Sequence, residues 1–261
     1  MNVLEIDGLR KIYKSRTHAL TGLALEVKEG ALMGFLGPNG AGKSTTINIL
    51  AGLLKPESGE IRFFGKSVTK SDYRYKRNAG FVLDQPVYIE KLTAKEYLTF
   101  VGMMYRLERQ EIEERSNDLI EFFELEDKGR DFIETYSAGM KKKLSLAAAV
   151  IHRPKLLILD EPLEGTDPVA ARQIKDMLGE MSRGGTSILL SSHNLDTVEK
   201  LCDEVAIINK GKLVFQSRTE DIRKKIKDEV SQETYQSLEE IFIDVVSKDG
   251  EQKEKKKLSW L

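Results

Sequence analysis

The feature that most constrains the fold is a glycine-rich segment, residues 37–44, with the sequence Gly-Pro-Asn-Gly-Ala-Gly-Lys-Ser. It matches the pattern G-x-x-x-x-G-K-[ST] and follows a continuously apolar run, residues 32–36, typical of a strand covered on both faces. A helix-like run, residues 45–54, comes directly after it. Strand, glycine-rich turn and helix in this order predict a loop whose backbone N–H groups surround phosphate oxygens.

The side chains of this segment favour a nucleotide bound with Mg²⁺. Lys43 supplies a positive charge for the β- and γ-phosphates, and the Ser44 hydroxyl is a ligand for Mg²⁺. The residues predicted to bind the nucleotide here are Gly37, Pro38, Asn39, Gly40, Ala41, Gly42, Lys43, Ser44 and Thr45. The alternative is a glycine-rich turn with an exposed lysine, which the flanking strand and helix argue against.

Two carboxylates end a second buried run. Residues 156–159 are apolar, and Asp160 and Glu161 follow them directly. A buried strand is not expected to end in adjacent acids unless their charges have a partner. Asp160 suits the outer shell of Mg²⁺ beside Ser44, and Glu161 suits the orientation or deprotonation of an attacking water. The alternative is a pair of solvated acids at a strand end.

The pattern of apolar residues predicts an α/β fold with two kinds of sheet. Continuously apolar runs indicate a mainly parallel sheet, whereas the alternation over residues 23–27 indicates a small antiparallel β subdomain. Between about residues 86 and 150 the pattern becomes helical, and Thr93 and Glu96 have the spacing of a capping box. This segment is predicted to be a helical insertion subdomain.

Composition limits the partners and the compartment. The 261 residues include 41 Lys and Arg against 42 Asp and Glu, so bulk charge does not favour a nucleic-acid partner. The longest nearly apolar stretch, residues 144–151, is far shorter than the roughly 20 residues of a spanning helix. The first residues lack the basic and apolar regions of a secretory signal, and the lone Cys202 forms no internal disulfide. A cytoplasmic location is expected.

In this order, the motifs resemble those of the nucleotide-binding subunit of ATP-binding cassette (ABC) transporters, over about residues 1–220. The segment Tyr136, Ser137, Ala138, Gly139, Met140 is similar to the family signature Leu-Ser-Gly-Gly-Gln, which it matches at Ser137 and Gly139. The resemblance implies a P-loop NTPase core and a signature helix over residues 141–151, capped by Ser137. Ser137 and Gly139 are then expected to contact a nucleotide phosphate.

The resemblance assigns roles to three further residues. Gln85 falls at the Q-loop glutamine, which links the γ-phosphate and Mg²⁺ to the helical insertion. His193 falls at the switch histidine, where the alternative is a structural histidine at a strand end. Tyr13 resembles the aromatic residue that stacks on adenine, with a core position as the alternative. The predicted catalytic set is Lys43, Gln85, Glu161 and His193, and the predicted metal set is Ser44, Gln85 and Asp160.

The loop before the next helix departs from the family pattern. Thr166 stands where the family usually has Leu, and Leu163 and Glu164 are also atypical, whereas Asp167 is retained. In the family this loop crosses between paired domains. The departures therefore concern communication between sites more than ATP binding.

The resemblance also implies partners and a mechanism. One phosphate loop and one signature per chain imply pairing with a second nucleotide-binding domain, expected to be a copy of the same chain. A separate transmembrane permease subunit is expected to dock near residues 85–93 and to hold the chain on the cytoplasmic face of the membrane. The expected activity is Mg-dependent ATP hydrolysis that powers transport by ATP-driven dimerisation.

The C-terminal pattern bears on the direction of transport. Residues 211–214 and 237–242 are similar to those of subunits serving export systems for drugs, peptides or ions, so export is expected. Residues 221–261 are predicted to form a helical extension and a charged tail. One alternative is a soluble regulatory ABC-type ATPase that transports nothing. Another is a subunit with a dead site, which the intact Lys43, Asp160, Glu161 and His193 argue against.

Overall fold

The computed structural model describes residues 1–68, 72–222 and 237–248. Its strands are β1 (Asn2–Ile12), β2 (His18–Lys28), β3 (Leu32–Leu36), β4 (Ser58–Phe63), β5 (Lys66–Ser67), β6 (Ala79–Val82), β7 (Leu156–Asp160), β8 (Ser187–Ser192), β9 (Glu204–Asn209) and β10 (Lys212–Arg218). Its α-helices are α1 (Lys43–Leu50), α2 (Ala94–Met104), α3 (Arg109–Phe122), α4 (Ala138–Val150), α5 (Pro168–Arg183), α6 (Leu195–Leu201) and α8 (Leu238–Lys248). Short 3₁₀ turns lie at Arg74–Asn78, Glu126–Lys128 and Ile133–Thr135.

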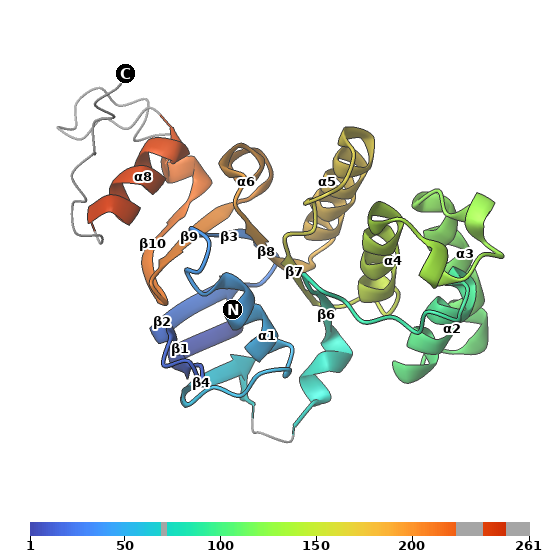
Figure 1. Ribbon diagram of the computed structural model, residues 1–261, viewed down its shortest axis with the longest axis horizontal. Helices are drawn as coiled ribbons and strands as arrows, with labels where there is room; N and C mark the ends of the chain where they lie inside the picture. The colour runs from blue at the N-terminus through green and yellow to red at the C-terminus, as the bar shows by residue number, and fades with distance from the viewer. Residues whose placement is uncertain (69–71, 223–236, 249–261) are drawn as a thin grey trace.

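A six-stranded sheet of order β10-β9-β3-β8-β7-β6 forms the centre of the fold (Figure 1). All neighbouring pairs in it are parallel except β10 with β9. The predicted strands 32–36 and 156–160 are confirmed with the same bounds. Alternate residues of β7 enter two separate cores, Leu156 and Ile158 one and Leu157 and Leu159 the other. Both faces of the sheet are covered at β3 and β7, which is why these central strands are apolar along most of their length.

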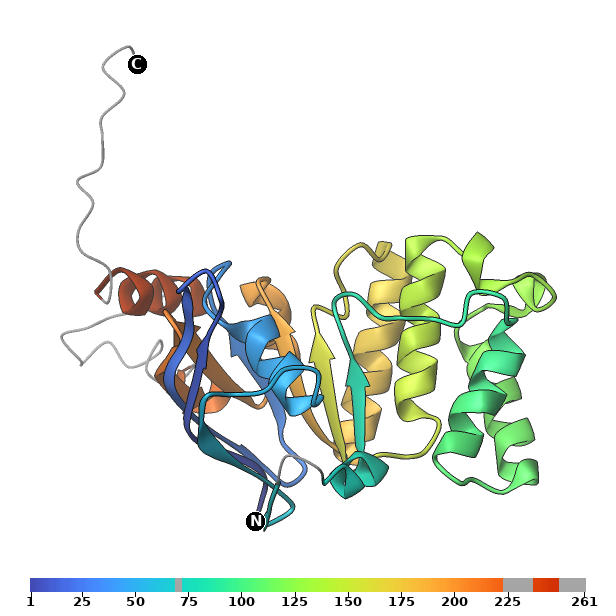
Figure 2. The same ribbon diagram turned by 60° about the horizontal axis from the view of Figure 1, so that its bottom comes forward.

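A four-stranded antiparallel sheet of order β2-β1-β4-β5 packs over one face of the parallel sheet, with α1 between the two (Figure 2). The α/β class, the mainly parallel sheet and the small antiparallel sheet predicted from the sequence are therefore confirmed. Strand β1 is longer than the alternation over its first residues suggests. Bulges along its pairing with β2 break the period of two that would mark a strand in the sequence.

The helical insertion contains α2, α3 and α4, at the right of Figure 1. The predicted capping box is confirmed, because Thr93 Oγ1 accepts from Glu96 N at 3.3 Å and a Glu96 carboxylate oxygen accepts from Thr93 N at 2.8 Å. Helix α4 begins at Ala138, before the predicted start at residue 141. Ser137 Oγ accepts a hydrogen bond from Met140 N at 3.2 Å, so the capped turn already includes Ala138 and Gly139.

Helix α8 lies within the helical extension predicted for residues 221–261. Ser237 Oγ accepts from Glu240 N at 3.3 Å, and Leu238 and Ile241 are buried in the core shared with α4, α5 and α6. The predicted charged tail lies outside the described residues, and the domain division at residue 220 stays a prediction. In the part of the chain that is described, no helix is long and apolar enough to cross a bilayer.

Candidate functional site

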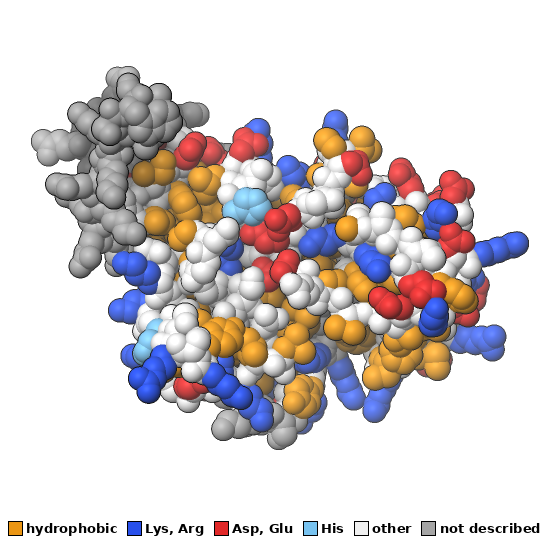
Figure 3. Space-filling view, viewed as in Figure 1, with side chains coloured by type: hydrophobic (Ala, Val, Ile, Leu, Met, Phe, Trp, Pro, Cys, Tyr) orange, Lys and Arg blue, Asp and Glu red, His pale blue; other side chains and the backbone are white. Residues whose placement is uncertain are grey.

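The carboxyl ends of β3, β8 and β7 lie side by side, and their loops line one pocket of about 520 Å³. This is the edge of a parallel sheet where ligands bind, and the volume is typical of small-molecule sites. The lining residues are Tyr13, Thr17, Ala19, the run 38–45, Asp84, Glu161, Glu164 and His193. Figure 3 shows acidic side chains gathered near the middle of this face, below α6, with a histidine beside them.

At two positions of the glycine-rich loop, Gly37 and Gly42, there is no space for a Cβ atom. A Cβ added at Gly37 would lie 2.4 Å from the carbonyl oxygen of Ile208. Gly42 has a φ of +114°, and its Cβ would lie 2.7 Å from the carbonyl oxygen of Ala19. Gly42 is also the N-cap of α1, which no side chain of the described residues caps. The first N–H groups of α1 therefore face the pocket as donors for an anion.

Lys43 is the buried cation of the pocket. Its side chain lies beneath the loop, and Nζ donates a hydrogen bond to the carbonyl oxygen of Gly37 at 2.7 Å. Burial lowers the pKa of Lys43, whereas the charges of Glu161, Asp160 and Glu164 act in the opposite direction. The ammonium group is thus placed where phosphate oxygens would meet it.

Asp160 and Glu161 are joined through Ser191 on the neighbouring strand β8. Ser191 Oγ donates to Asp160 Oδ1 at 2.6 Å and accepts from the backbone N–H of Glu161 at 3.0 Å. Asp160 is almost completely buried and does not line the pocket itself. The sequence analysis gave Ser191 no role. No pattern in the sequence marks this role, because Ser191 meets the two acids only through the pairing of β8 with β7.

Glu161 and His193 form a pair that faces the pocket. His193 Nδ1 donates to Glu161 Oε2 at 3.0 Å, and the side chains are 58% and 14% exposed for His193 and Glu161 respectively. Glu161 has a φ of +46°, a strained conformation that is typical of functional sites. The ligand atoms of Glu161, Glu164 and His193 lie within 4.8 Å of one another, so these residues could hold a metal ion.

The structure does not place Gln85 in this pocket. Gln85 is exposed, whereas the preceding residue, Asp84, is a lining residue. Strand β6 ends at Val82, and the loop that follows it places Asp84 in the lining of the pocket. The sequence analysis missed Asp84. An acid shortly after a buried strand, at the same sheet edge as Asp160, is the signal that could have identified it.

Tyr13 lies at the rim of the pocket. Its hydroxyl hydrogen-bonds with Thr45 Oγ1 at 3.2 Å, and the residue is 38% exposed. The alternative core position is therefore wrong. A partly exposed aromatic ring at the edge of a phosphate pocket is suited to stacking on a base.

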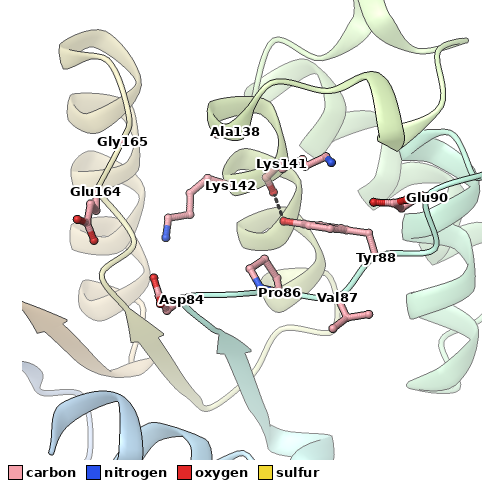
Figure 4. A pocket seen from close by; sticks show the side chains of 10 residues that line it. All are labelled: Asp84, Pro86, Val87, Tyr88, Glu90, Ala138, Lys141, Lys142, Glu164 and Gly165. Carbon is pink, nitrogen blue, oxygen red and sulfur yellow. Dashed lines mark hydrogen bonds between the residues drawn. The ribbon is translucent and has the colours of Figure 1, made fainter. Parts of the chain in front are cut away.

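Ser137 and Gly139 do not line this pocket. Ala138, which lies between them, lines a second cavity of about 820 Å³ (Figure 4). That cavity is lined by Asp84, Pro86, Val87, Tyr88, Glu90, Ala138, Lys141, Lys142, Glu164 and Gly165. The Tyr88 hydroxyl donates to the carbonyl oxygen of Lys141 at 2.6 Å and accepts from Ser145 Oγ at 2.5 Å. The loop after β6 is thereby fixed to α4.

The donor atoms of the pocket fit a nucleotide with a hard divalent cation. Ser44 and Asp84 in the lining, and Asp160 buried behind it, offer only oxygen ligands, which Mg²⁺ prefers. Backbone N–H groups and Lys43 offer donors for phosphate oxygens, and Tyr13 offers an aromatic surface. The arrangement can bind a nucleoside triphosphate and orient a water beside Glu161.

Comparisons with known proteins agree with this chemistry. Residues 20–164 match the family model described as ABC transporter. The chain is 34% identical over 242 residues to the linearmycin resistance ATP-binding protein LnrL of Bacillus subtilis (strain 168), which covers 92% of this chain and 78% of that protein. It is 37% identical over 227 residues to the daunorubicin/doxorubicin resistance ATP-binding protein DrrA of Streptomyces peucetius, covering 87% and 68% respectively.

Solved structures show the same fold. The structure of an ATP-binding subunit of an ABC transporter superposes with a TM-score of 0.83 at 32% identity, covering 93% of this chain and 99% of that one. The family match spans the glycine-rich loop, the signature segment, Asp160 and Glu161. The chain therefore belongs to the ATP-binding subunits of the ABC transporter family.

Proposed function

We propose that this chain is a Mg-dependent ATPase that powers export through a separate membrane subunit. One observation carries the hydrolytic part of the proposal. The His193–Glu161 pair, joined at 3.0 Å, faces the pocket that the phosphate loop lines. A carboxylate oriented by an imidazole beside a phosphate site is suited to activating water for attack on a γ-phosphate.

The residues proposed to act in this reaction have distinct parts. N–H groups of the loop and of α1 bind the phosphates, Lys43 neutralises their charge, and the Tyr13 ring stacks on adenine. Mg²⁺, when bound, would offset charge on the β- and γ-phosphate oxygens, with Ser44 as ligand and Asp160 acting through water. Asp84 takes the position expected of Gln85 and offers a carboxylate on that side. Glu161 accepts the proton of the attacking water while His193 holds the carboxylate in place.

The position of the signature segment supports pairing of two copies of the chain. Ser137 and Gly139 begin α4 on the helical insertion, and neither lines the chain's own phosphate pocket. A helix N-terminus with this sequence needs a phosphate from elsewhere to fulfil the expected role. We propose that the second copy supplies it. ATPase activity per chain should then rise with protein concentration.

The second cavity supports docking of a membrane subunit. It lies at the loop after β6, where docking was predicted from the sequence, and Val87 in its lining is 90% exposed. Together with the drug-resistance proteins among the relatives, this supports export through a permease and a position on the cytoplasmic face of the membrane.

The substitution Glu161→Gln tests the catalytic assignment. We expect kcat for ATP hydrolysis to fall by at least about 100-fold, because the water loses its proton acceptor, while MgATP still binds. Glu180→Gln is the matched control, since Glu180 lies on α5 outside the phosphate pocket. Normal turnover in Glu161→Gln would contradict the proposal.

Reconstitution with a candidate membrane subunit tests the transport part. Altered ATP hydrolysis together with movement of a solute out of the cytoplasmic compartment would support export. Hydrolysis that is indifferent to every such subunit would instead favour a soluble regulatory ATPase.

A further inference from the structure

Two carboxylates belong to both cavities of the molecule. Asp84 and Glu164 line the phosphate pocket, and they also line the 820 Å³ cavity beside it. Asp84 follows β6 and Glu164 follows β7, and these strands pair in parallel, so the two acids share one edge of the sheet. Glu164 places a negative charge next to the expected position of the γ-phosphate, where it would repel a bound nucleotide.

A lysine from the helical insertion lies opposite these carboxylates. Lys142 is on α4 and lines the larger cavity. Figure 4 shows its side chain extending into the space between Asp84 and Glu164, whereas the side chain of Lys141 extends to the opposite side. The charge of Lys142 is therefore aimed at the boundary between the two cavities.

The electrostatic surroundings of Lys142 agree with this placement. Burial lowers the pKa of Lys142, and four carboxylates act in the opposite direction, in the order Asp84, Glu164, Asp160 and Glu161. Three of these acids, all except Asp84, also act on Lys43. The acids of the nucleotide pocket thus lie between two lysines, one in the phosphate loop and one on α4.

We propose that Lys142 is a positioning residue for nucleotide binding, which offsets the charges of Asp84 and Glu164 and so sets the affinity of the pocket for ATP. This inference rests on the proposed ATP site and assigns a new residue to it. The affinity for ATP then depends in part on a residue of the helical insertion, and not only on the loop that contacts the phosphates. Without Lys142, the two carboxylates lose the cation that the helical insertion provides.

A double-mutant cycle on the full chain tests the proposal, with the dissociation constant of fluorescent N-methylanthraniloyl-ATP in Mg²⁺ as the measured quantity. We expect Lys142→Met to raise this constant about tenfold, and Lys142→Arg to stay within about threefold of wild type. Glu164→Gln should bind slightly more tightly than wild type. In Lys142→Met/Glu164→Gln, removal of the excess acid should restore most of the affinity.

Lys141→Met is the matched control, because it removes the same charge from the same helix but on the opposite side. Its dissociation constant should equal that of wild type. The backbone carbonyl that accepts from Tyr88 is retained in this variant. A thermal unfolding curve for every variant shows whether a loss of affinity reflects a loss of folded protein.

Three results would overturn the proposal: Lys142→Met binding as wild type, the double variant binding as weakly as Lys142→Met, or Lys141→Met having the same effect. If Lys142→Met does not fold, two other variants test the proposal: the single variant Glu164→Gln and the double variant Lys142→Arg/Glu164→Gln. Weaker nucleotide binding than wild type in either variant contradicts the proposal. Wild-type protein that binds the nucleotide but does not hydrolyse ATP would refute the proposed ATPase and leave this inference standing.

Discussion

The two helix N-termini that the ABC family uses for phosphates differ in this chain. Helix α1 begins after Gly42, in a left-handed conformation and without a side-chain cap among the described residues. Helix α4 begins after Ser137, whose hydroxyl already accepts from Met140 N. Close backbone contacts fix the conformation at the start of α1. At the start of α4, the Ser137 side chain already accepts from one of the free N–H groups.

Under the proposed function, this difference separates a site whose shape is complete in one chain from a site that needs the phosphates of a partner. The N–H groups at α1 have a geometry that no residue with a Cβ could reproduce at Gly42. Those at α4 belong to an ordinary helix whose N-cap is a serine side chain. We therefore expect substitutions at α1 to affect nucleotide binding by the single chain, and substitutions at α4 to affect the paired state.

The largest effect is expected for Gly42→Ala. The new Cβ meets the Ala19 carbonyl at 2.7 Å at a positive φ, so the loop must shift. MgATP affinity should fall about 100-fold, and the free energy of unfolding by about 2–3 kcal/mol. Gly40→Ala is the comparison, because its Cβ has no neighbour within 4 Å and only the backbone strain remains. Equal effects of the two variants, by isothermal calorimetry, would break the argument.

Ser191→Ala tests whether the acids beside α1 depend on the neighbouring strand. It leaves Asp160 Oδ1 and Glu161 N–H without their common partner, so the free energy of unfolding should fall by about 1–3 kcal/mol. We expect kcat to fall about tenfold, because Glu161 loses its orientation. In Ser192→Ala the lost acceptor serves only Asn194 N, and kcat should stay near the wild-type value. Steady-state assays of both variants decide.

The stability of the protein should depend on pH through a histidine near the C-terminal end of α4. The imidazole of His152 is buried and stacked on the Tyr105 ring, with the ring centroids 3.6 Å apart. Burial lowers the pKa of His152 from 6.5 to about 4. The unfolded chain takes up this proton first, so stability is complete above pH 6.5 and is lost as the pH falls toward 4. The expected loss is about 1–3 kcal/mol. Urea unfolding of His152→Phe over this range should show a smaller pH slope than wild type; equal slopes would refute the assignment.

The smallest effect on the single chain is expected for Ser137→Ala. Loss of the cap should lower the free energy of unfolding by about 1 kcal/mol, while MgATP binding by the chain stays unchanged. Ser137→Asp sharpens the test, since aspartate also caps helices but adds a negative charge. Its stability should equal that of wild type, yet concentration-dependent ATP hydrolysis should fall. If Ser137→Asp hydrolyses ATP normally, α4 does not receive a partner's phosphates.

The strands that carry the site were predictable because the physics is local. Residues 32–36 are an apolar run that ends at a glycine, residues 156–159 are one that ends at two acids, and both runs are strands in the structure. The direction of side chains in the loops was harder to predict from the sequence. Whether Asp84 or Gln85 faces the pocket depends on the residue at which β6 ends, and periodicity does not resolve a shift of one residue. Ser191 becomes functional only through the pairing of β7 with β8, which no local pattern shows.

The Tyr88 hydroxyl has a mechanical consequence. It holds the loop after β6 to two successive turns of α4 through Lys141 and Ser145, and burial raises the pKa of Tyr88 to about 12, so the hydroxyl keeps its proton. The loop and α4 are thus joined through one phenol ring. A displacement of the exposed Val87 would therefore be passed through Tyr88 to α4, the helix whose N-cap is Ser137.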